Sequence, residues 1–244
     1  MDLNELGSGV DPKTHWYYRS KSVPLLELFR SLGPGPTDVV DLGAGSGYFS
    51  DALAEQRGRA VGAVYRVDSG YAAPSSSAAP RTGRKLVQAL EPPETIQNSL
   101  ILMMDVLEHV EDDAGFLHGI ARRCRGENRV FITVPAFMSL WSGHDEFLGH
   151  KRRYRLAQLE KLVAGAGVKI NASYYIFGAI FPAVWALRRL RGAEQRSDLK
   201  PPPPLVGPLL EGLCRAEMPL RRLNRLFGLS CVIEGTIRRE SSVV

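Results

Sequence analysis

The sequence is poor in cysteine. Its three cysteines, Cys124, Cys214 and Cys231, lie far apart and lack the spacing of metal ligands. Neither a disulfide framework nor a zinc site is supported, so no metal-binding residues are expected and a reducing cytoplasm is the expected setting. The first residues include the acids Asp2 and Glu5 where a secretory signal has a basic and then an apolar segment, so no export signal is expected.

Most of the chain has little net charge, and the excess of basic residues is concentrated near the C-terminus. Residues 188–239 contain eleven Lys and Arg against five Asp and Glu, a net charge of +6, so the other residues together carry about −1 of the total of +5. Such a region can attract nucleic acid, anionic lipid headgroups or phosphorylated substrates, or it can be a solvated helix face. With 244 residues, 44% of them hydrophobic, the chain can form one domain with a sizeable core and an elaboration.

A glycine-rich segment follows the first strand-like run. Residues 39–42 are apolar apart from one acid, and Gly43, Gly45 and Gly47 follow before a helix that begins near Tyr48. Glycines let the backbone turn sharply and approach a ligand, and the free amide groups at a helix start favour an anion. A dinucleotide-binding loop would have glycine in place of Tyr48, and a Walker loop would continue with Gly-Lys-Ser or Gly-Lys-Thr. We interpret the segment as a nucleotide-type cofactor site, the alternative being a plain strand-to-helix turn.

An acid closes the next predicted strand. Residues 48–57 show helical spacing and end at Gly58, and residues 60–67 form an apolar strand that ends at Asp68. In a β-α-β unit this position lies beside the glycine loop, where a carboxylate can accept both hydroxyl groups of an adenosine ribose. Asp68-Ser69-Gly70 is also good turn chemistry, so an ordinary turn acid is the alternative.

Strands and helices alternate through most of the remaining chain. The apolar run 99–104 ends at Asp105 and is typical of a strand buried on both faces at the centre of a parallel sheet. The alternation predicts an α/β fold with a doubly wound, mostly parallel sheet and ligands at the carboxyl ends of its strands. Residues 70–83 are small and polar and are expected to form a flexible loop. The other predicted elements are strands at 85–90, 129–135, 168–175 and 230–237 and helices at 113–125 and 156–166.

Four segments resemble the motifs of one enzyme family. Residues 41–47 have the order D-x-G-x-G-x-G, and residues 105–110 read Asp-Val-Leu-Glu-His-Val. Residues 135–155 are similar to a "VPAF..LW..HD...GH.RRY" segment, and residues 15–19 to an "HWWF.R" opening. On these segments the chain resembles the class I S-adenosylmethionine-dependent methyltransferases, in particular a bacterial branch that acts on small molecules. The resemblance covers most of residues 13–170.

The resemblance implies a Rossmann-like sheet of seven strands, the last of them antiparallel, and methyl transfer from S-adenosylmethionine. The expected division is an N-terminal helical lid at 1–35, a methyltransferase core at 36–175 and 230–240, and a helical insertion at 176–229 before the last strand. Arg19 is expected to pair with the carboxylate of the cofactor, or else to be an ordinary surface arginine. The residues expected to bind the cofactor are Arg19, Asp41, Gly43, Ala44, Gly45, Gly47, Asp68, Asp105 and Val106.

Two histidines and an acid follow the fifth strand of the expected core. His144, Asp145 and His150 lie in the loop at the edge where the methyl acceptor is expected. Methyl transfer needs a base only if the acceptor carries a proton of high pKa, and a histidine can take a hydroxyl proton near neutral pH. We take these three as the catalytic candidates, with His144 as the first candidate base and His150 as the second. Alternatively they hold the loop by hydrogen bonds, as Glu108 and His109 are interpreted to do in the neighbouring loop.

The expected insertion combines apolar and basic residues. Residues 176–187 are apolar, arginines follow between 188 and 191, and after the prolines at 201–204 the stretch 205–229 is amphipathic. One interpretation is an interfacial pair of helices that contacts a membrane surface or a lipid-linked acceptor. The other is a helical cap or a dimer face.

Three functions are left open by the sequence. The first is methylation of a small-molecule or lipid-linked acceptor by a cytoplasmic enzyme that associates with the inner face of the membrane. The second is methylation of a nucleic acid such as RNA, which the basic region suggests but which lacks support from an Asn-Pro-Pro-Tyr or Pro-Cys motif. The third is a non-catalytic module that binds the cofactor. The acceptor, its attacking atom and the oligomeric state are not determined.

Overall fold

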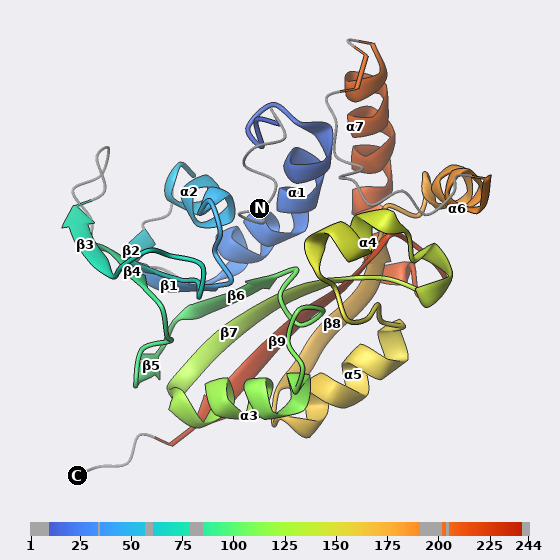
Figure 1. Ribbon diagram of the computed structural model, residues 1–244. Helices are drawn as coiled ribbons and strands as arrows, with labels where there is room; N and C mark the ends of the chain where they lie inside the picture. Colours follow the sequence, from blue (N-terminus) through green and yellow to red (C-terminus); the bar gives the residue numbers. More distant parts are fainter. Residues whose placement is uncertain are drawn as a thin grey trace.

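The computed structural model describes residues 10–33, 35–56, 61–78, 85–190, 202–203 and 205–240, and it shows a central β-sheet with helices on both faces (Figure 1). The strands are β1 (Thr37–Leu42), β2 (Val61–Val67), β3 (Ser75–Ala78), β4 (Lys85–Ala89), β5 (Ile96–Gln97), β6 (Leu100–Met104), β7 (Cys124–Pro135), β8 (Lys169–Ile176) and β9 (Ser230–Arg239). The helices are α1 (Trp16–Ser31), α2 (Tyr48–Ala54), α3 (Asp113–Arg123), α4 (Gly143–Leu148), α5 (Leu156–Gly165), α6 (Phe181–Leu190) and α7 (Val206–Glu217), with the 3-10 helices η2 (Met138–Leu140) and η3 (Met218–Leu223).

The sheet is mostly parallel. Its order is β3-β4-β2-β1-β6-β7-β9-β8, and β5 pairs with the start of β7. Strands β4, β2, β1, β6 and β7 run parallel, whereas β9 lies antiparallel between β7 and β8. The doubly wound α/β fold with an antiparallel last strand is therefore confirmed. The described chain has nine strands, because β3 and the two-residue β5 are added to the seven of the expected core.

The segment 70–83 differs from the expected flexible loop. Residues 75–78 form β3, which pairs antiparallel with β4 at the end of the sheet. Ser75 lies opposite Gln88, and its hydroxyl donates to Gln88 Oε1 at 2.8 Å. Pairing of backbone groups along the open side of β4 explains why a polar, weakly patterned segment becomes a strand. Residues 79–84 lie outside the described part of the chain.

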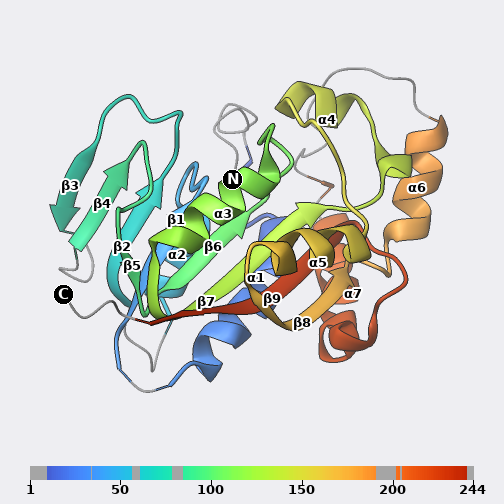
Figure 2. The ribbon, with the colours of Figure 1, turned by 90° about the horizontal axis from the view of Figure 1, so that it is seen from below.

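The central strands are buried because helices cover both of their faces. Helices α3 and α5 lie on one side of the sheet, and α1, α2 and α7 lie on the other (Figures 1 and 2). In β6, Leu100 and Leu102 belong to the core beneath α1 and α2, whereas Ile101 and Met103 belong to the core beneath α3 and α5. The continuous apolar run of β6 follows from this two-sided burial.

The boundary between α3 and β7 lies earlier than the sequence pattern predicted. Helix α3 ends at Arg123 instead of residue 125, and β7 begins at Cys124 instead of residue 129. Cys124 pairs with Ile96 of β5, and Gly126 pairs with Arg239 at the end of β9. Pairing with two distant strands extends β7, and local periodicity does not contain this information.

The segment between β8 and β9 contains α6, α7 and η3. Helix α7 packs beside α1, and in Figure 1 it projects above the sheet. Within the described ranges, no helix is both long and apolar enough to cross a bilayer. Arg191, the prolines at 201 and 204 and the expected helix stop at Gly58 lie outside those ranges. The proposed division into lid, core and insertion stays a prediction.

Replacing a buried core leucine should reduce stability much more than replacing an exposed one. Leu102 in β6 is fully buried, so we expect Leu102→Ala to lower the free energy of unfolding by roughly 2 to 5 kcal/mol through lost burial and the cavity left behind. Leu209 in α7 is 70% exposed, so Leu209→Ala should change the same free energy by less than about 0.5 kcal/mol. Urea denaturation followed by circular dichroism measures both, and equal losses would contradict this placement of the core.

Candidate functional site

The loops after β1, β2, β6 and β7 meet at the carboxyl edge of the sheet, where doubly wound folds bind ligands. In the loop after β1, Gly43, Gly45 and Gly47 have φ values of 64°, 50° and 75°. Residues with a Cβ atom adopt this region at a cost. A Cβ atom on Gly43 would also lie 2.6 Å from Cγ2 of Val106 in the loop after β6. The structure thus brings the predicted cofactor residues Gly43 and Val106 into direct contact.

Asp68 lies beside the glycine loop, as the sequence predicted for the end of β2. Its Oδ2 atom accepts a hydrogen bond from the Gly45 amide at 2.8 Å, and its Oδ1 atom accepts one from the Gly70 amide at 2.8 Å. The Tyr71 hydroxyl donates to the Gly45 carbonyl at 2.9 Å. Ala44 is tied to the same strand end, since its amide donates to the Val67 carbonyl. Asp68 therefore orders the glycine loop and forms a turn at the same time.

Asp41 is a buried acid near the end of β1. Within the described ranges its Oδ2 atom has no hydrogen-bond partner. Burial raises the pKa of the Asp41 carboxyl to about 6, although Ser50 and the Arg66 guanidinium act to lower it. Arg66 is itself engaged, because its Nε atom donates to Ser50 Oγ at 3.0 Å and its guanidinium pairs with Asp51. A cation in the adjacent crevice would stabilise the carboxylate form of Asp41.

Asp105 forms a buried ion pair that sequence reasoning missed. Lys21 of α1 is fully buried, and its Nζ atom donates to Asp105 Oδ2. The same Nζ atom donates to the Tyr17 hydroxyl at 3.0 Å. Asp105 Oδ1 accepts a hydrogen bond from the Thr133 hydroxyl at 3.1 Å. Burial alone would raise the pKa of Asp105, but the Lys21 ammonium outweighs it and holds that pKa below its usual value. Tyr17 and Lys21 are one helical turn apart on α1, so their side chains can meet. This spacing was the only feature of the sequence that pointed to Lys21 as a partner for a polar group.

Asp145 and His144 lie in helix α4 and not in a loop as expected, and Asp145 anchors the segment that carries the two candidate histidines. Its carboxylate is fully buried and accepts hydrogen bonds from Arg153 at 2.7 and 3.0 Å. It also accepts one from the Ser142 amide at 2.9 Å, and His150 Nδ1 lies 2.9 Å from Oδ1. These donors outweigh burial and hold the pKa of Asp145 far below its usual value. Both carboxylate oxygens of Asp145 accept hydrogen bonds, so the side chain holds its neighbours in position. The catalytic role of Asp145 stays a prediction, which these contacts do not support.

The two candidate bases have different surroundings. His144 is half-buried in α4, and the centroid of its ring lies 6.5 Å from that of His150. His150 instead lies against His109, with ring centroids 4.7 Å apart. Glu108, His109 and His150 each offer a possible metal-ligand atom, and these three atoms lie within 4.8 Å of one another. The sequence predicted no metal-binding residues, because the histidines come from two loops about 40 residues apart.

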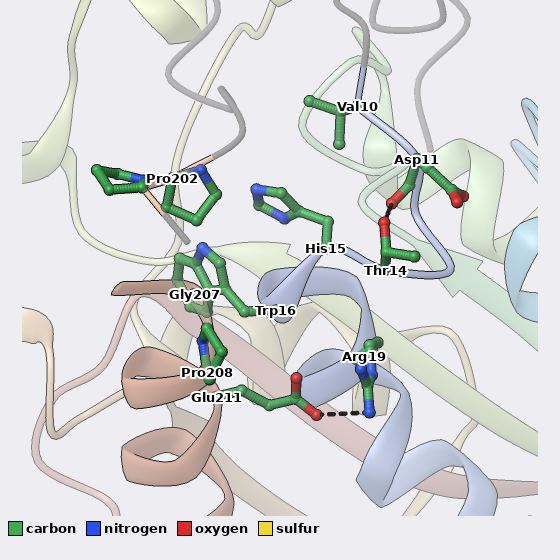
Figure 3. Close-up of a pocket in the computed structure, with 11 residues that line it drawn as sticks. Val10, Asp11, Thr14, His15, Trp16, Arg19, Pro202, Gly207, Pro208 and Glu211 are labelled. Atoms are coloured by element: carbon green, nitrogen blue, oxygen red, sulfur yellow. Dashed lines mark hydrogen bonds and ion pairs between the residues drawn. The ribbon is translucent and has the colours of Figure 1, made fainter. Parts of the chain in front are cut away.

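Arg19 has an ion-pair partner that the sequence did not predict. Its guanidinium pairs with Glu211 of α7 at 3.1 Å, across a cavity of about 350 Å³ between the start of α1 and the start of α7 (Figure 3). Trp16 and Pro208 also line this cavity. Arg19 still acts on Tyr48, the first residue of α2, because its charge lowers a pKa that burial raises. The expected contact between Arg19 and the cofactor carboxylate stays a prediction.

Comparison with known proteins gives a consistent result. A family described as a methyltransferase domain matches residues 15–173. A protein of Mycolicibacterium smegmatis named "Probable S-adenosylmethionine-dependent methyltransferase" is 25% identical over 172 residues, which are 69% of this chain and 65% of that protein. The chain spans less than two thirds of the length of the curated relatives that it matches.

Solved structures of methyltransferases share the fold. A chain of the complex between the Haloferax volcanii Trm112 methyltransferase activator and a methyltransferase has a TM-score of 0.55 at 18% identity, and the match covers 94% of this chain and 92% of that chain. Phosphoethanolamine N-methyltransferase 2 of Haemonchus contortus, solved with S-adenosyl-L-methionine, has a TM-score of 0.52 at 14% identity over 90% of this chain and 52% of that chain. At these identities the likeness concerns the fold alone.

The stability of the chain should depend on pH through Asp41. The carboxyl has a pKa near 3.8 in the unfolded chain and about 6 in the folded one, so its contribution to stability is fully present below pH 3.8 and is lost as pH rises through 6. Relative to Asp41→Asn, the wild type should lose stability between pH 4 and pH 7, by about 3 kcal/mol for a shift of this size. Urea denaturation of both proteins at several pH values measures this; parallel curves would contradict it.

Proposed function

Since the chain belongs to the methyltransferase-domain family and is an S-adenosylmethionine-dependent methyltransferase, we propose that it methylates a lipid-linked acceptor at the carboxyl edge of its sheet. The observation that carries this proposal is a set of exposed leucines in the segment between β8 and β9. A soluble small-molecule acceptor is the alternative, and the labelling experiment described below distinguishes it from a lipid-linked acceptor.

The residues at the edge of the sheet fit the cofactor. The glycines let the loop approach its neighbours closely, since a Cβ atom on Gly43 would lie 2.6 Å from Cγ2 of Val106, and the buried Oδ2 atom of Asp41 lacks a partner within the described ranges. Asp68 and the loop at 105–106 follow β2 and β6, the two strands that flank β1, and so lie at the same edge of the sheet. When bound, S-adenosylmethionine supplies an electrophilic methyl group on its sulfonium. We propose that Asp41 receives its cationic amino-acid end and that Asp68 receives its ribose hydroxyl groups.

Holding the reactants in line is the main task that remains for the protein. Orientation of two reactants can supply about 7 to 11 kcal/mol of a barrier in favourable systems. The Asp145 network holds the segment that carries His144 at this edge, and half-buried His144 stays the candidate base for an acceptor hydroxyl. If the acceptor needs no deprotonation, His144 has no role in the chemical step.

The exposed leucines support a membrane-bound acceptor. These leucines are between 66% and 87% exposed, and they are Leu205, Leu209, Leu220, Leu223 and Leu226. They lie at both ends of α7, and exposed large apolar side chains of this kind are a feature of surfaces that contact a membrane or a partner. Arginines lie among these leucines, which suits the boundary between acyl chains and anionic headgroups. Helix α7 also borders the cavity at Arg19, so an acceptor held at the start of α7 would lie near the start of α1.

The same arginines argue against RNA as the acceptor. Arg215 pairs with Glu211 at 2.8 Å, and Arg225 pairs with Glu160 at 2.8 Å. Pairing within the chain reduces the positive charge that a phosphate backbone or an anionic headgroup would meet, so the proposal of a lipid-linked acceptor rests on the leucines and not on the arginines. A decisive experiment incubates the purified chain with methyl-labelled S-adenosylmethionine and a cell extract separated into lipid, RNA and small-molecule fractions. Label in the lipid fraction is expected, whereas label in another fraction, or none, would overturn the proposed acceptor.

Removing the Asp68 carboxylate should weaken cofactor binding. Hydrogen bonds to a charged group contribute about 1.5 to 3 kcal/mol each, so Asp68→Ala should lower the affinity for S-adenosylmethionine by a factor of roughly ten or more. Asp38→Ala is the matched control, because Asp38 also accepts from a backbone amide, that of Ala63 at 2.8 Å, but at the opposite end of β1. Isothermal titration calorimetry measures both. Equal affinities for the Asp68 variant and the wild type would refute the ribose role.

The exposed leucines should be needed for binding to membranes. Each fully buried leucine is worth about 1.5 to 3 kcal/mol, so the double variant Leu223→Ser, Leu226→Ser should bind anionic phospholipid vesicles at least roughly tenfold more weakly than the wild type. Leu90→Ser is the control, because Leu90 is also exposed but follows β4. Vesicle sedimentation measures the binding. A wild type that stays in the supernatant, or a double variant that binds equally well, would rule out this surface.

A further inference from the structure

Three potential metal ligands meet beside the predicted cofactor crevice. Glu108 and His109 lie in the loop after β6, and His150 lies in the loop after β7, next to it in the sheet. The Lys151 amide donates to the Glu108 carbonyl at 2.8 Å, which ties the two loops together. One ligand atom from each of the three side chains lies within 4.8 Å of the other two. Their spacing is set by the parallel pairing of β6 and β7 and not by one flexible segment.

The imidazole of His150 is held in the orientation that metal-binding histidines have. Its side chain is nearly buried, and Nδ1 lies 2.9 Å from Oδ1 of the fully buried Asp145. With Nδ1 donating to the carboxylate, Nε2 is the nitrogen with a lone pair for a ligand. A carboxylate behind a histidine fixes the tautomer and raises the basicity of the metal-binding nitrogen. Arg153 in turn holds Asp145 by two hydrogen bonds, so the whole arrangement is rigid.

Glu108 is the group that most needs a cation. Its side chain is completely buried, and neither carboxylate oxygen has a hydrogen-bond partner among the residues that the structure describes. A buried carboxylate without a partner is costly as an anion and still lacks an acceptor when protonated. A divalent cation would satisfy both oxygens and favour the ionised form.

We propose that Glu108, His109 and His150 bind a divalent metal ion of the zinc class, whose remaining coordination positions bind an oxygen of the methyl acceptor. Two imidazoles and one carboxylate are a ligand set that Zn²⁺ and related transition metals prefer, and three protein ligands leave a position open. Ligand atoms that share a tetrahedral Zn²⁺ lie about 3.3 Å apart, so rotation of the half-buried His109 imidazole and of the Glu108 side chain toward Nε2 of the fixed His150 closes the site.

The metal would act on the acceptor and not on the cofactor. A coordinated hydroxyl group loses its proton to water more readily, because the metal stabilises the resulting oxygen anion. The loop of Glu108 begins at Asp105 and Val106, so the metal would lie close to the predicted methyl donor. The action of the metal on the acceptor rests on the proposed function and implies an acceptor that is methylated on oxygen. Binding of the metal does not depend on it.

Metal binding is tested on the whole purified chain after treatment with a chelator, without cofactor or acceptor. Zn²⁺ titrated by calorimetry should bind with a stoichiometry of one. Glu108→Gln and His150→Ala should each weaken the affinity by at least roughly 100-fold, since loss of a supporting group alone costs about 10- to 100-fold. His118→Ala is the matched control, because His118 is an exposed histidine of α3 outside the cluster and should leave the affinity unchanged.

Two further measurements keep the proposal falsifiable if a variant fails to fold. Co²⁺ bound to the wild type should give visible absorption bands of a site with nitrogen and oxygen ligands. In the wild type with ¹⁵N-labelled histidine, Zn²⁺ should shift the imidazole signals of His109 and His150 and leave that of His118 in place. Absence of stoichiometric binding, or unchanged signals for His109 and His150, would overturn the site. Metal binding without any methylated product would instead leave the site standing and count against the proposed function.

Discussion

The structure depends on supplying a partner for each carboxylate that is buried at the carboxyl edge of the sheet. Asp105 is paired with Lys21, and Asp145 is paired with Arg153. Removing one partner of such a buried pair typically costs about 3 to 5 kcal/mol, because the remaining charge is left uncompensated. Glu108 lies in the same region, and no described residue supplies its partner. Among the described residues, compensation of this edge is therefore incomplete at Glu108, beside the two histidines, and at Asp41, whose Oδ2 atom also lacks a partner, so a ligand can contribute most at these two places.

Helix α1 connects this edge with the segment that carries the exposed leucines. Lys21 reaches Asp105 at the end of β6, and Arg19 reaches Glu211 of α7 at 3.1 Å. A third ion pair joins Glu27 of α1 to Arg221 of η3 at 2.6 Å. One helix thus contacts both the place where the chemistry is proposed and the surface where the acceptor is proposed to arrive. The position of α7 and the arrangement of Asp105 are consequently coupled through a rigid element.

Much of the fold could be predicted from the sequence, because its signals are local. The apolar runs ending in Asp68 and Asp105 identified β2 and β6, and the glycines of residues 43–47 identified the turn between β1 and α2. The predictions were wrong where pairing with a strand that is distant in the sequence decides whether a segment forms a strand or where a strand begins. Residues 75–78 form a strand against β4, and β7 begins at Cys124 because β5 and β9 pair with it. Neither partner is visible in the local pattern.

By itself, the sequence determined the α/β class, the order of the main strands and the place of the glycine loop, since hydrophobic periodicity and glycine spacing act over a few residues. Only the tertiary structure decided which charged groups meet. It placed Lys21 against Asp105, turned Arg19 toward Glu211, and occupied Asp145 with Arg153. It also gathered two histidines and a glutamate from separate loops. The physical reason is that charge pairing and ligand geometry depend on distances in space, which packing of the sheet and helices sets.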